Sequence, residues 1–284
     1  MSARADGPRA RELARLYCPP EQRAVLDALT GIEAEIRAGL DRRLDHALAH
    51  ARLGWWREEC ERLTQGAPLH PLTRELDGRF GASGRAVLGG VRGFTDLATW
   101  DLACATFASR GELDAYCERW SSACIEPLAY FALGERARLR ARDFGTRLCE
   151  LELLNDLAPT ARAGRVRLPL DELAQAQVLP EALQAAHWDA PLAALVRARH
   201  ESARAALAQQ LGVFAPPEQA ALRALFAWAA LASVQSQRLA AALPRATSPG
   251  DHHAPLDGWR AWRAARKAAA GRFVRAVQQN GERS

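Results

Sequence analysis

Helical spacing is the feature that most restricts the fold of this chain. Apolar residues recur three and four positions apart along almost all of its 284 residues, which is the spacing of one face of an α-helix. The breaks in this pattern predict helices over residues 20–49, 51–64, 71–80, 95–108, 111–132, 134–158, 170–176, 180–187, 189–210, 216–243 and 257–279. No clear strand is predicted. Helices this continuous, joined by short loops, predict one all-α bundle.

Length and composition favour a single cytoplasmic domain over residues 1–284. The stretch RATSPGDHHAP, residues 245–255, predicts a flexible link before the last helix. No segment approaches the ~20 apolar residues of a membrane span, and the N-terminus lacks the apolar core of a signal peptide. The cysteines form no CxxC pair, so we expect reduced thiols at positions 18, 60, 104, 117, 124 and 149.

The net charge of +5 is unevenly distributed. From Trp259 to the end there are seven basic residues and one acidic residue, so this segment carries +6 and the rest of the chain −1. Because no basic face with interleaved aromatic residues recurs elsewhere, nucleic-acid binding is not expected. The net positive charge of the chain therefore comes from this C-terminal segment.

The predicted C-terminal helix, 257–279, has an apolar side and a basic side. The apolar side of its helical wheel holds Trp259, Trp262, Ala269, Ala270, Phe273 and Val277, although Arg266 interrupts it. A basic amphipathic helix with tryptophans is typical of a helix that lies on an anionic membrane surface. That reading predicts a peripheral protein at the inner face of the membrane. The alternative is a helix docked on the bundle.

The stretch NDLAPTARAGRVRLPLDEL, residues 155–173, resembles a helix end followed by a binding loop. Apolar residues at helical spacing precede it, so Asp156 should lie near the end of that helix. Pro159 should disfavour helical geometry at Ala158. Gly164 and Pro169 then shape the loop that carries Arg165.

Several motifs occur in a specific order along the chain. They are PPEQR at 19–23, RLGWWREECERL at 52–63, HPLT at 70–73, the pair Tyr116-Cys117, and AGRVRLP at 163–169. Their order and spacing resemble the squalene/phytoene synthase family, from about residue 15 to 210 and more weakly to the end. The resemblance implies an isoprenoid synthase-type bundle around a central cavity, lined by the helices near 24–48 and 134–158. Trp55 and Trp56 are expected in the core.

Active members of that family join two prenyl diphosphates head to head, using two aspartate pairs at i, i+4. This spacing puts both carboxylates of a pair on one helix face, where they hold Mg²⁺ through carboxylates and substrate phosphates. Counted from PPEQR, the first pair falls at Arg37 and Asp41; counted back from Gly164, the second falls at Asp156 and Thr160. Each pair has therefore lost one aspartate.

Two lost ligands make ordinary Mg²⁺-dependent synthesis unexpected, because even indirect changes around a metal cost ~10–100-fold. Cys149 and Glu152 also fall where active members carry polar residues of the second motif. No cofactor is therefore expected, except Mg²⁺ at Asp41 and Asp156 if the protein is active. Arg37 still suits phosphate, so a prenyl diphosphate or lipid ligand is compatible with the pocket.

Several polar residues allow two interpretations. Asp41 and Asp45 form a new i, i+4 pair, which is either a displaced metal site or a solvated surface beside basic neighbours. His46 and His50 suit zinc by spacing, but no third ligand is evident, and the other reading is surface. Asp156 is either a retained ligand or a polar helix end.

Two functions remain as hypotheses. The first is a non-catalytic family member that binds a prenyl or lipid ligand or acts as an assembly or scaffold factor with an unknown client. Residues 28–56, ALTGIEAEIRAGLDRRLDHALAHARLGWW, resemble the branch that includes a mitochondrial complex I assembly factor. The second is an active prenyltransferase of squalene, phytoene or hopanoid-type isoprenoid biosynthesis, with Asp41, Asp45 and Asp156 holding metal in a shifted register.

Overall fold

The computed structural model describes residues 9–39, 46–103, 105–248 and 256–273. The chain forms two compact units. Unit 1 comprises residues 1–18, 106–114 and 147–284, and unit 2 comprises residues 19–105 and 115–146. Within the described ranges there is no named strand, only an isolated bridge between His187 and Arg245. The predicted all-α fold class is confirmed, while the single domain over 1–284 stays a prediction.

Unit 2 contains residues 19–105 and parts of two later helices. Its elements are α2 (Pro20–Ala38), α3 (His46–Gln65), α4 (Pro71–Leu88), η1 (Gly89–Arg92), α5 (Gly93–Leu102), most of α6 (Arg110–Leu133), η2 (Glu135–Ala137) and the start of α7 (Arg138–Asn155). Proline occupies the first turn of α2, where its missing N–H costs no bond. The buried positions of α2 follow the predicted spacing: Val25, Leu29, Ile32 and Ile36.

Gly145 lets α6 and α7 approach closely within unit 2. A Cβ at this position would lie 2.1 Å from Ser121 Oγ and 2.8 Å from Ile125 Cβ. The Ser121 hydroxyl donates a hydrogen bond to the Arg142 carbonyl oxygen at 2.8 Å, which ties the same helices together. A larger residue at 145 would therefore push the two helices apart.

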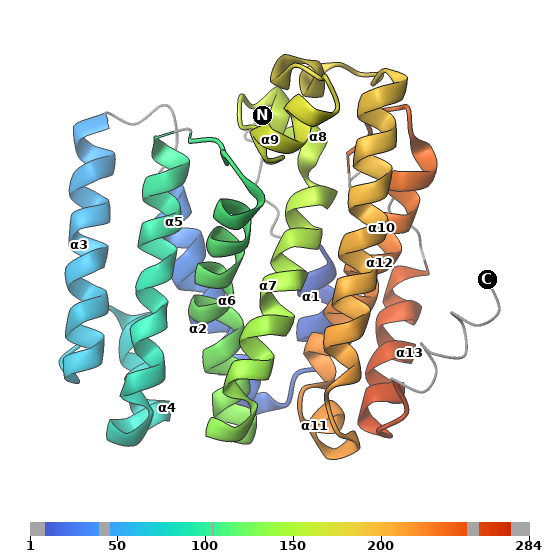
Figure 1. Cartoon of the computed structure of the whole chain (residues 1–284). Helices are drawn as coiled ribbons and strands as arrows, with labels where there is room; N and C mark the ends of the chain where they lie inside the picture. Colours follow the sequence, from blue (N-terminus) through green and yellow to red (C-terminus); the bar gives the residue numbers. More distant parts are fainter. Residues whose placement is uncertain (1–8, 40–45, 104, 249–255, 274–284) are drawn as a thin grey trace. The chain divides into compact units, whose positions relative to one another are not determined.

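Unit 1 contains the remaining helices. These are α1 (Arg9–Arg15), the start of α6, the end of α7, α8 (Leu157–Arg162), α9 (Leu170–Gln175), η3 (Pro180–Gln184), α10 (Ala190–Gly212), α11 (Pro216–Ala221), α12 (Arg223–Ala242) and α13 (Asp257–Ala269). α12 packs against α1, α10 and α13; α12 and α13 lie side by side in Figure 1. Trp228 and Phe226 of α12 are among the largest fully buried side chains.

The boundaries differ from the prediction mainly at short elements. α1 was not predicted, because seven residues give too little periodicity. The first long helix ends at Ala38 rather than near 49. α4 runs to Leu88 but is kinked at Gly81, directly after the predicted end at residue 80, where the φ of 59° and ψ of −170° are non-helical and readily adopted by glycine. The link also differs at its start: Ala246 is buried and its N–H donates to the Ala186 carbonyl oxygen at 2.9 Å. Residues 249–255 lie outside the described ranges.

The expected break at Ala158 was wrong. α7 ends at Asn155, and α8 begins at Leu157 with Pro159 in its first turn and Ala158 inside it. First-turn N–H groups have no intrahelical acceptor, so proline there removes no hydrogen bond. The chain therefore re-enters a helix directly after Asp156.

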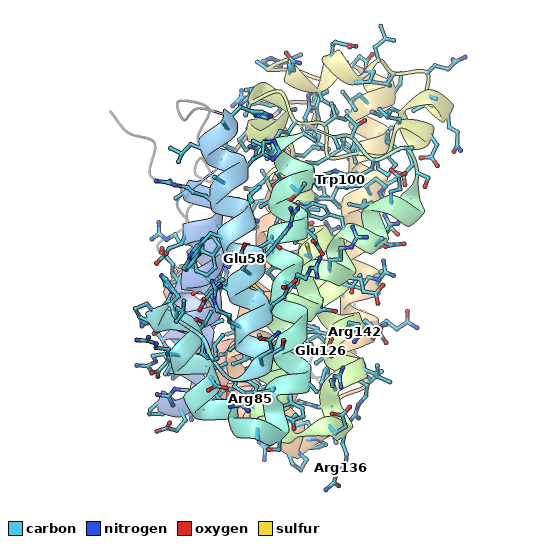
Figure 2. All side chains as sticks on the ribbon, turned by 90° about the vertical axis from the view of Figure 1, so that its left-hand side faces the viewer. Glu58, Arg85, Trp100, Glu126, Arg136 and Arg142 are labelled. Atoms are coloured by element: carbon cyan, nitrogen blue, oxygen red, sulfur yellow. The ribbon has the colours of Figure 1, made fainter. Side chains whose placement is uncertain are left out.

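Two buried glutamates hold unit 2 together. Glu59 accepts hydrogen bonds from the backbone N–H groups of Leu69 and His70, both at 2.8 Å, and from the Thr73 hydroxyl. Burial acts to raise the pKa of Glu59, but these bonds and one from Arg62 outweigh it and lower that pKa. Glu126 on α6 accepts bonds in the same way from Arg138 and Arg142 of α7. Figure 2 labels Glu126 and Arg142.

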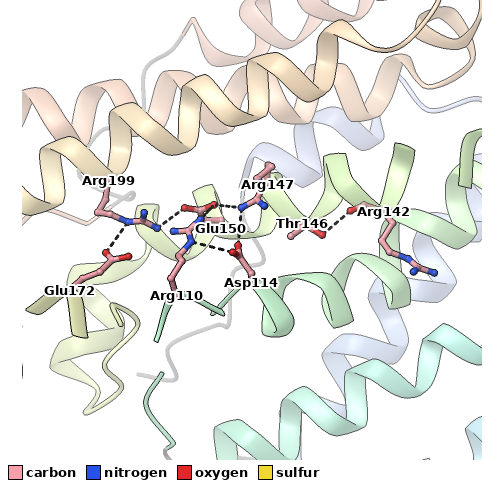
Figure 3. Close-up of polar contacts among 8 residues, drawn as sticks. All are labelled: Arg110, Asp114, Arg142, Thr146, Arg147, Glu150, Glu172 and Arg199. Atoms are coloured by element: carbon pink, nitrogen blue, oxygen red, sulfur yellow. Dashed lines mark hydrogen bonds and ion pairs between the residues drawn. The ribbon is translucent and has the colours of Figure 1, made fainter. Parts of the chain in front are cut away.

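A third buried glutamate, Glu150, anchors α7 inside unit 1. Its carboxylate accepts from Arg110 at 2.7 Å, from Arg147 at 3.2 Å and from Arg199 at 2.7 Å (Figure 3). Asp114 and Glu172 pair with the same arginines, so three acidic and three basic side chains form one network. A buried charge of this kind needs its partners, because removing them leaves an uncompensated ion.

Candidate functional site

The first motif position is occupied by an ion pair. Arg37 lies in the last turn of α2, and its Nη2 is 3.0 Å from Oε1 of Glu33, one turn earlier. The Glu33 side chain is 5 % exposed and that of Arg37 is 57 % exposed, so the arginine reaches inward to a buried carboxylate. Trp120 Nε1 donates to the same Glu33 oxygen at 3.1 Å. A phosphate ligand at Arg37 would have to compete with Glu33.

The cavity that adjoins this pair is small. The adjoining cavity has a volume of about 10 Å³ and is lined by Glu33, Arg37, Phe94, Leu97, Ala98 and Asp101. Such a volume holds about one water molecule. Asp101 brings a second buried carboxylate, which lies 3.4 Å from the Tyr116 hydroxyl that donates to it. Because the Arg37 side chain is more than half exposed, an anion would reach it from the solvent side in competition with Glu33, and the anion site at Arg37 stays a prediction.

The other candidates near the first motif are Asp41 and Asp45. Both lie outside the described residues, so the displaced metal pair stays a prediction. His46 and His50 begin α3, with their Nε2 atoms 3.0 Å apart and both rings exposed. Two histidines alone do not complete a zinc site.

The second motif keeps the one-turn spacing of its two positions but only one of its two carboxylates. Asp156 immediately precedes α8, and its carbonyl oxygen accepts the Thr160 N–H at 3.0 Å. The Thr160 hydroxyl donates to the carbonyl oxygens of Asp156 at 2.7 Å and of Leu157 at 3.0 Å. The two side chains are thus one helix turn apart, as predicted, and the hydroxyl at 160 faces the backbone of its own helix.

A pocket opens beside Asp156 within unit 1. Its volume is about 70 Å³, and its walls come from α1, α7, α12 and α13: Arg9, Ala10, Leu13, Glu152, Asn155, Asp156, Leu231, Ala232, Gln235 and Asp257. The leucines and alanines form an apolar part, and the remaining residues supply polar atoms. Of the predicted site residues, the structure places Asp156 in this pocket.

One polar atom of the pocket lacks a partner. Asn155 is buried, and its Nδ2 donates to the Ala232 carbonyl oxygen at 3.1 Å, while its Oδ1 accepts no hydrogen bond from the described residues. Buried polar atoms are normally paired with protein, water or ligand. A hydrogen-bond donor is therefore missing at this point of the pocket wall.

The carboxylates around Asn155 are partly used. Glu152 accepts a hydrogen bond from Trp228 Nε1, and the guanidinium of Arg11 lies 5.7 Å above the Trp228 ring. Asp257 accepts two bonds from Arg238, at 2.7 and 3.0 Å, and one from Arg260. These hydrogen bonds hold the Glu152 and Asp257 carboxylates in the pocket wall, so neither carboxylate is open to an ion.

The described residues do not fit a dedicated Mg²⁺ site. They contain no group of three or more His, Cys, Asp or Glu side chains arranged to hold a metal ion. Mg²⁺ requires near-octahedral oxygen coordination, whereas position 37 supplies a cation and position 160 a hydroxyl turned to the backbone. No catalytic step through Mg²⁺ is supported by these residues.

Arg165 closes the loop after α8 and does not line the pocket. Its backbone N–H donates to the Thr160 carbonyl oxygen at 2.9 Å, and Gly164 before it has a φ of 80°. Arg167, two residues on, is buried with its guanidinium 6.0 Å from the Phe107 ring centroid. The predicted loop is therefore fixed, but as a connection to the core of unit 1.

The prediction missed two walls of the pocket. Arg9 and Leu13 belong to the unpredicted helix α1, and Asp257 belongs to a tail that was expected to lie on a membrane or dock on the bundle, not to line a pocket. Asp257 had a local signal, since an acidic residue in a first turn is typical of a helix start. Its pairing with Arg238 could not be predicted from the tail sequence, because Arg238 lies on the preceding helix, α12.

Comparisons with known proteins agree on one family. A family model described as squalene/phytoene synthase matches residues 6–260. The structure is similar to a dehydrosqualene synthase solved in complex with ligand, with a TM-score of 0.70 and 14 % identity over 96 % of this chain and 92 % of the other. No curated protein sequence matched.

A second solved structure supports the same fold. Squalene synthase HpnC from Alicyclobacillus acidocaldarius matches with a TM-score of 0.63 and 16 % identity, covering 80 % of this chain and 86 % of that one. The bundle is thus the all-α fold of the isoprenoid synthases. The family model covers most of the chain, and the chain belongs to the squalene/phytoene synthase family.

Proposed function

We propose that this chain is a non-catalytic member of the squalene/phytoene synthase family that binds a prenyl or lipid ligand and serves as an assembly or scaffold factor. The observation that carries the proposal is the pair formed by Arg37 and Glu33. A metal-binding carboxylate is expected at position 37, and a cation held by a buried carboxylate takes its place. This exchange reverses the charge that Mg²⁺ would meet.

The pocket beside Asp156 supports binding rather than synthesis. At about 70 Å³ it is smaller than the ~300–1,000 Å³ of typical small-molecule sites. Its apolar part suits the end of a prenyl chain, and the unpaired Asn155 Oδ1 suits a head group that donates a hydroxyl proton. A prenyl alcohol or monophosphate combines both features.

We also propose that the protein acts as a peripheral protein on the cytoplasmic side of a membrane. Among the residues that the structure describes, no helix has the length and apolar character of a membrane span. An isoprenoid or lipid ligand would itself partition into a bilayer, so a protein that captures it benefits from working at the membrane surface.

The catalytic half of the proposal is tested by product analysis. The full chain is incubated with farnesyl or geranylgeranyl diphosphate and Mg²⁺, and no squalene- or phytoene-type product is expected. Turnover that disappears in Asp156→Ala would contradict the proposal and establish the alternative, an active prenyltransferase.

The binding half is tested by calorimetry with farnesol and farnesyl monophosphate. Ala10→Trp, placed on the half-buried wall of α1, should weaken binding about tenfold or more, because the indole fills the pocket. Ala194→Trp on the exposed side of α10 is the matched control and should leave binding unchanged. No binding of either ligand, or equal loss in both variants, would remove the ligand from the proposal.

A further inference from the structure

Helix α13 is docked on unit 1 by alanines. Ala261, Ala264, Ala265 and Ala268 are buried, and α13 packs against α12, α1 and α11. Its first turn is tied down because Asp257 accepts hydrogen bonds from Arg238 of α12. Beyond its end, Phe273 is buried with its ring centroid 5.1 Å from that of Phe226. The docked-helix alternative is thus correct for this face.

Docking does not hide the tryptophans. Trp259 is 50 % exposed and Trp262 41 % exposed, and Arg263 and Arg266 are exposed on the same side. Positions 259, 262, 263 and 266 follow the three- and four-residue spacing of a single helix face. The expectation that Phe273 belongs with these rings was wrong, because it turns into the core after Gly271; residues 274–279 lie outside the described ranges.

Two leucines extend this face at its start. Leu256 is exposed directly before α13, and Leu16 is exposed just after α1. The Tyr17 hydroxyl donates to the Gly258 carbonyl oxygen at 3.4 Å, which brings the end of α1 beside the start of α13. We use the name α13 outer face for Leu16, Leu256, Trp259, Trp262, Arg263 and Arg266.

Each exposed indole of the α13 outer face is paired with a guanidinium. Arg263 lies 5.2 Å from the Trp259 ring centroid, and Arg266 lies 4.9 Å from that of Trp262. No acidic residue occurs between Gly258 and Phe273 in the sequence, whereas Arg260, Lys267 and Arg272 add further positive charge. The face is therefore apolar and strongly basic at once.

A tryptophan–arginine pair on α3 has acidic neighbours, unlike the pairs on α13. Trp55 on α3 was expected in the core, but it is 40 % exposed with the Arg62 guanidinium 5.7 Å from its ring. Arg62 also pairs with Glu58 at 3.5 Å and with Glu59 at 2.9 Å. The charge beside Trp55 is therefore offset, and an exposed tryptophan–arginine pair alone does not define a cationic surface.

We propose that the α13 outer face is the surface by which this protein docks on an anionic membrane leaflet. The proposal deepens the peripheral location given under the proposed function, and rests on it only for the choice of a membrane as site of action. In water each guanidinium covers an indole face. At the leaflet, lipid phosphates take the guanidinium groups while the indoles enter the headgroup region, where aromatic rings are favoured. The alanine face keeps α13 docked throughout.

The test is co-sedimentation of the full chain with phosphatidylcholine vesicles, with and without phosphatidylglycerol, at low and high salt. No isoprenoid is present, so the result is independent of ligand binding, which is measured without vesicles. Binding should require the anionic lipid and weaken with salt. Arg263→Gln/Arg266→Gln should weaken it about 30-fold, since each basic residue near the surface contributes ~1 kcal/mol.

Removal of the rings tests the apolar part. Trp259→Ala/Trp262→Ala should weaken binding about tenfold by loss of buried apolar area. Two matched controls should bind like the unmodified chain: Trp55→Ala, and Arg136→Gln/Arg197→Gln, which removes two exposed arginines on other helices. Circular dichroism verifies that every variant is folded.

Three results would overturn the docking surface. These are equal binding to neutral and anionic vesicles, equal losses in the controls, and unchanged binding by both α13 double variants. A dimer in solution that dissociates in Trp259→Ala/Trp262→Ala would assign the face to a second copy of the chain instead.

Discussion

The regions around Arg37 and Asp156 each depart from the family pattern at one aspartate, yet the outcomes differ. At Arg37 the new charge is bound by Glu33, and about 10 Å³ of cavity remains. At Thr160 a small hydroxyl turns to its own helix, and about 70 Å³ remains beside an unpaired buried oxygen. The charge-reversing residue at 37 is accommodated by an ion pair, whereas the small neutral residue at 160 bonds to its own backbone and lies outside the pocket lining. A ligand is therefore favoured at the second region.

The largest expected loss of stability comes from loosening α7, the helix that leads into Asp156. Glu150→Gln removes the buried charge that three arginines of unit 1 share, and should lower the free energy of unfolding by ~3–5 kcal/mol. Urea denaturation measures it. Glu135→Gln, an exposed glutamate paired with Arg138, is the control and should cost less than ~1 kcal/mol. Equal costs would mean that Glu150 does not anchor α7.

A pH titration sharpens the contrast, because His200 lines a small cavity beside Asn155 of the second region. Burial, aided by Arg204, lowers the pKa of His200 to about 4. The unfolded chain thus binds an extra proton between its ordinary pKa, ~6.5, and about 4. Stability is complete above pH ~6.5 and should fall by about 3 kcal/mol as the pH drops to 4.

His200→Gln isolates this contribution. The glutamine does not titrate and can still bond with the Ser236 hydroxyl, which lies 2.8 Å from His200 Nδ1. The slope of unfolding free energy against pH should therefore flatten between 6.5 and 4. An unchanged slope would assign the acid sensitivity to carboxylates such as Glu59 and Glu126, whose pKa values are lowered in the fold.

Restoring the family residue at the first region should fail. Arg37→Asp removes the ion pair and places a carboxylate near buried Glu33, which should cost roughly 2 kcal/mol. Addition of Mg²⁺ should not recover this loss, because Glu33 already accepts a hydrogen bond from Trp120 Nε1 and the described residues offer no group of three metal ligands here. Thermal unfolding with and without Mg²⁺ measures both effects, and Arg37→Gln separates loss of the pair from the added charge. A Mg²⁺-dependent gain would show that the first region had stayed open.

The corresponding change at the second region should have the smallest cost. Thr160→Asp adds a carboxylate one turn from Asp156 at a half-buried position, and should change stability by less than ~1 kcal/mol. It should also introduce a Mg²⁺ response of about 1.4 kcal/mol at ten times the dissociation constant. Combining it with Asp156→Asn should abolish that response. A response in the unmodified chain would contradict the missing-ligand interpretation.

Much of the fold follows from local sequence, but contacts between distant segments do not. The spacing of Val25, Leu29 and Ile32 predicted the buried face of α2, and Glu33–Arg37 is an i, i+4 pair that can be read directly. The burial of Glu33 depends on Trp120, far along the chain. For the same reason the network around Glu150 was not predicted, since Arg110 and Arg199 lie 40 and 49 residues away.

The tail shows a different reason for an incomplete prediction. A helical wheel gives most weight to Trp259 and Trp262 and least to alanine. In the structure the alanine face packs on the bundle, because small side chains allow close approach to α12, and the tryptophans remain outside. Which face docks depends on the partner helix, and this information is absent from residues 257–279.

The buried glutamates also bear on how such a chain changes over generations. Glu59, Glu126 and Glu150 with their arginines hold the helices together, and none of them lines the pocket beside Asp156. Substitutions at the motif positions 37 and 160 therefore leave these ion-pair networks intact. A lineage with this layout can give up a reaction one residue at a time and keep a stable body that is free to acquire another task.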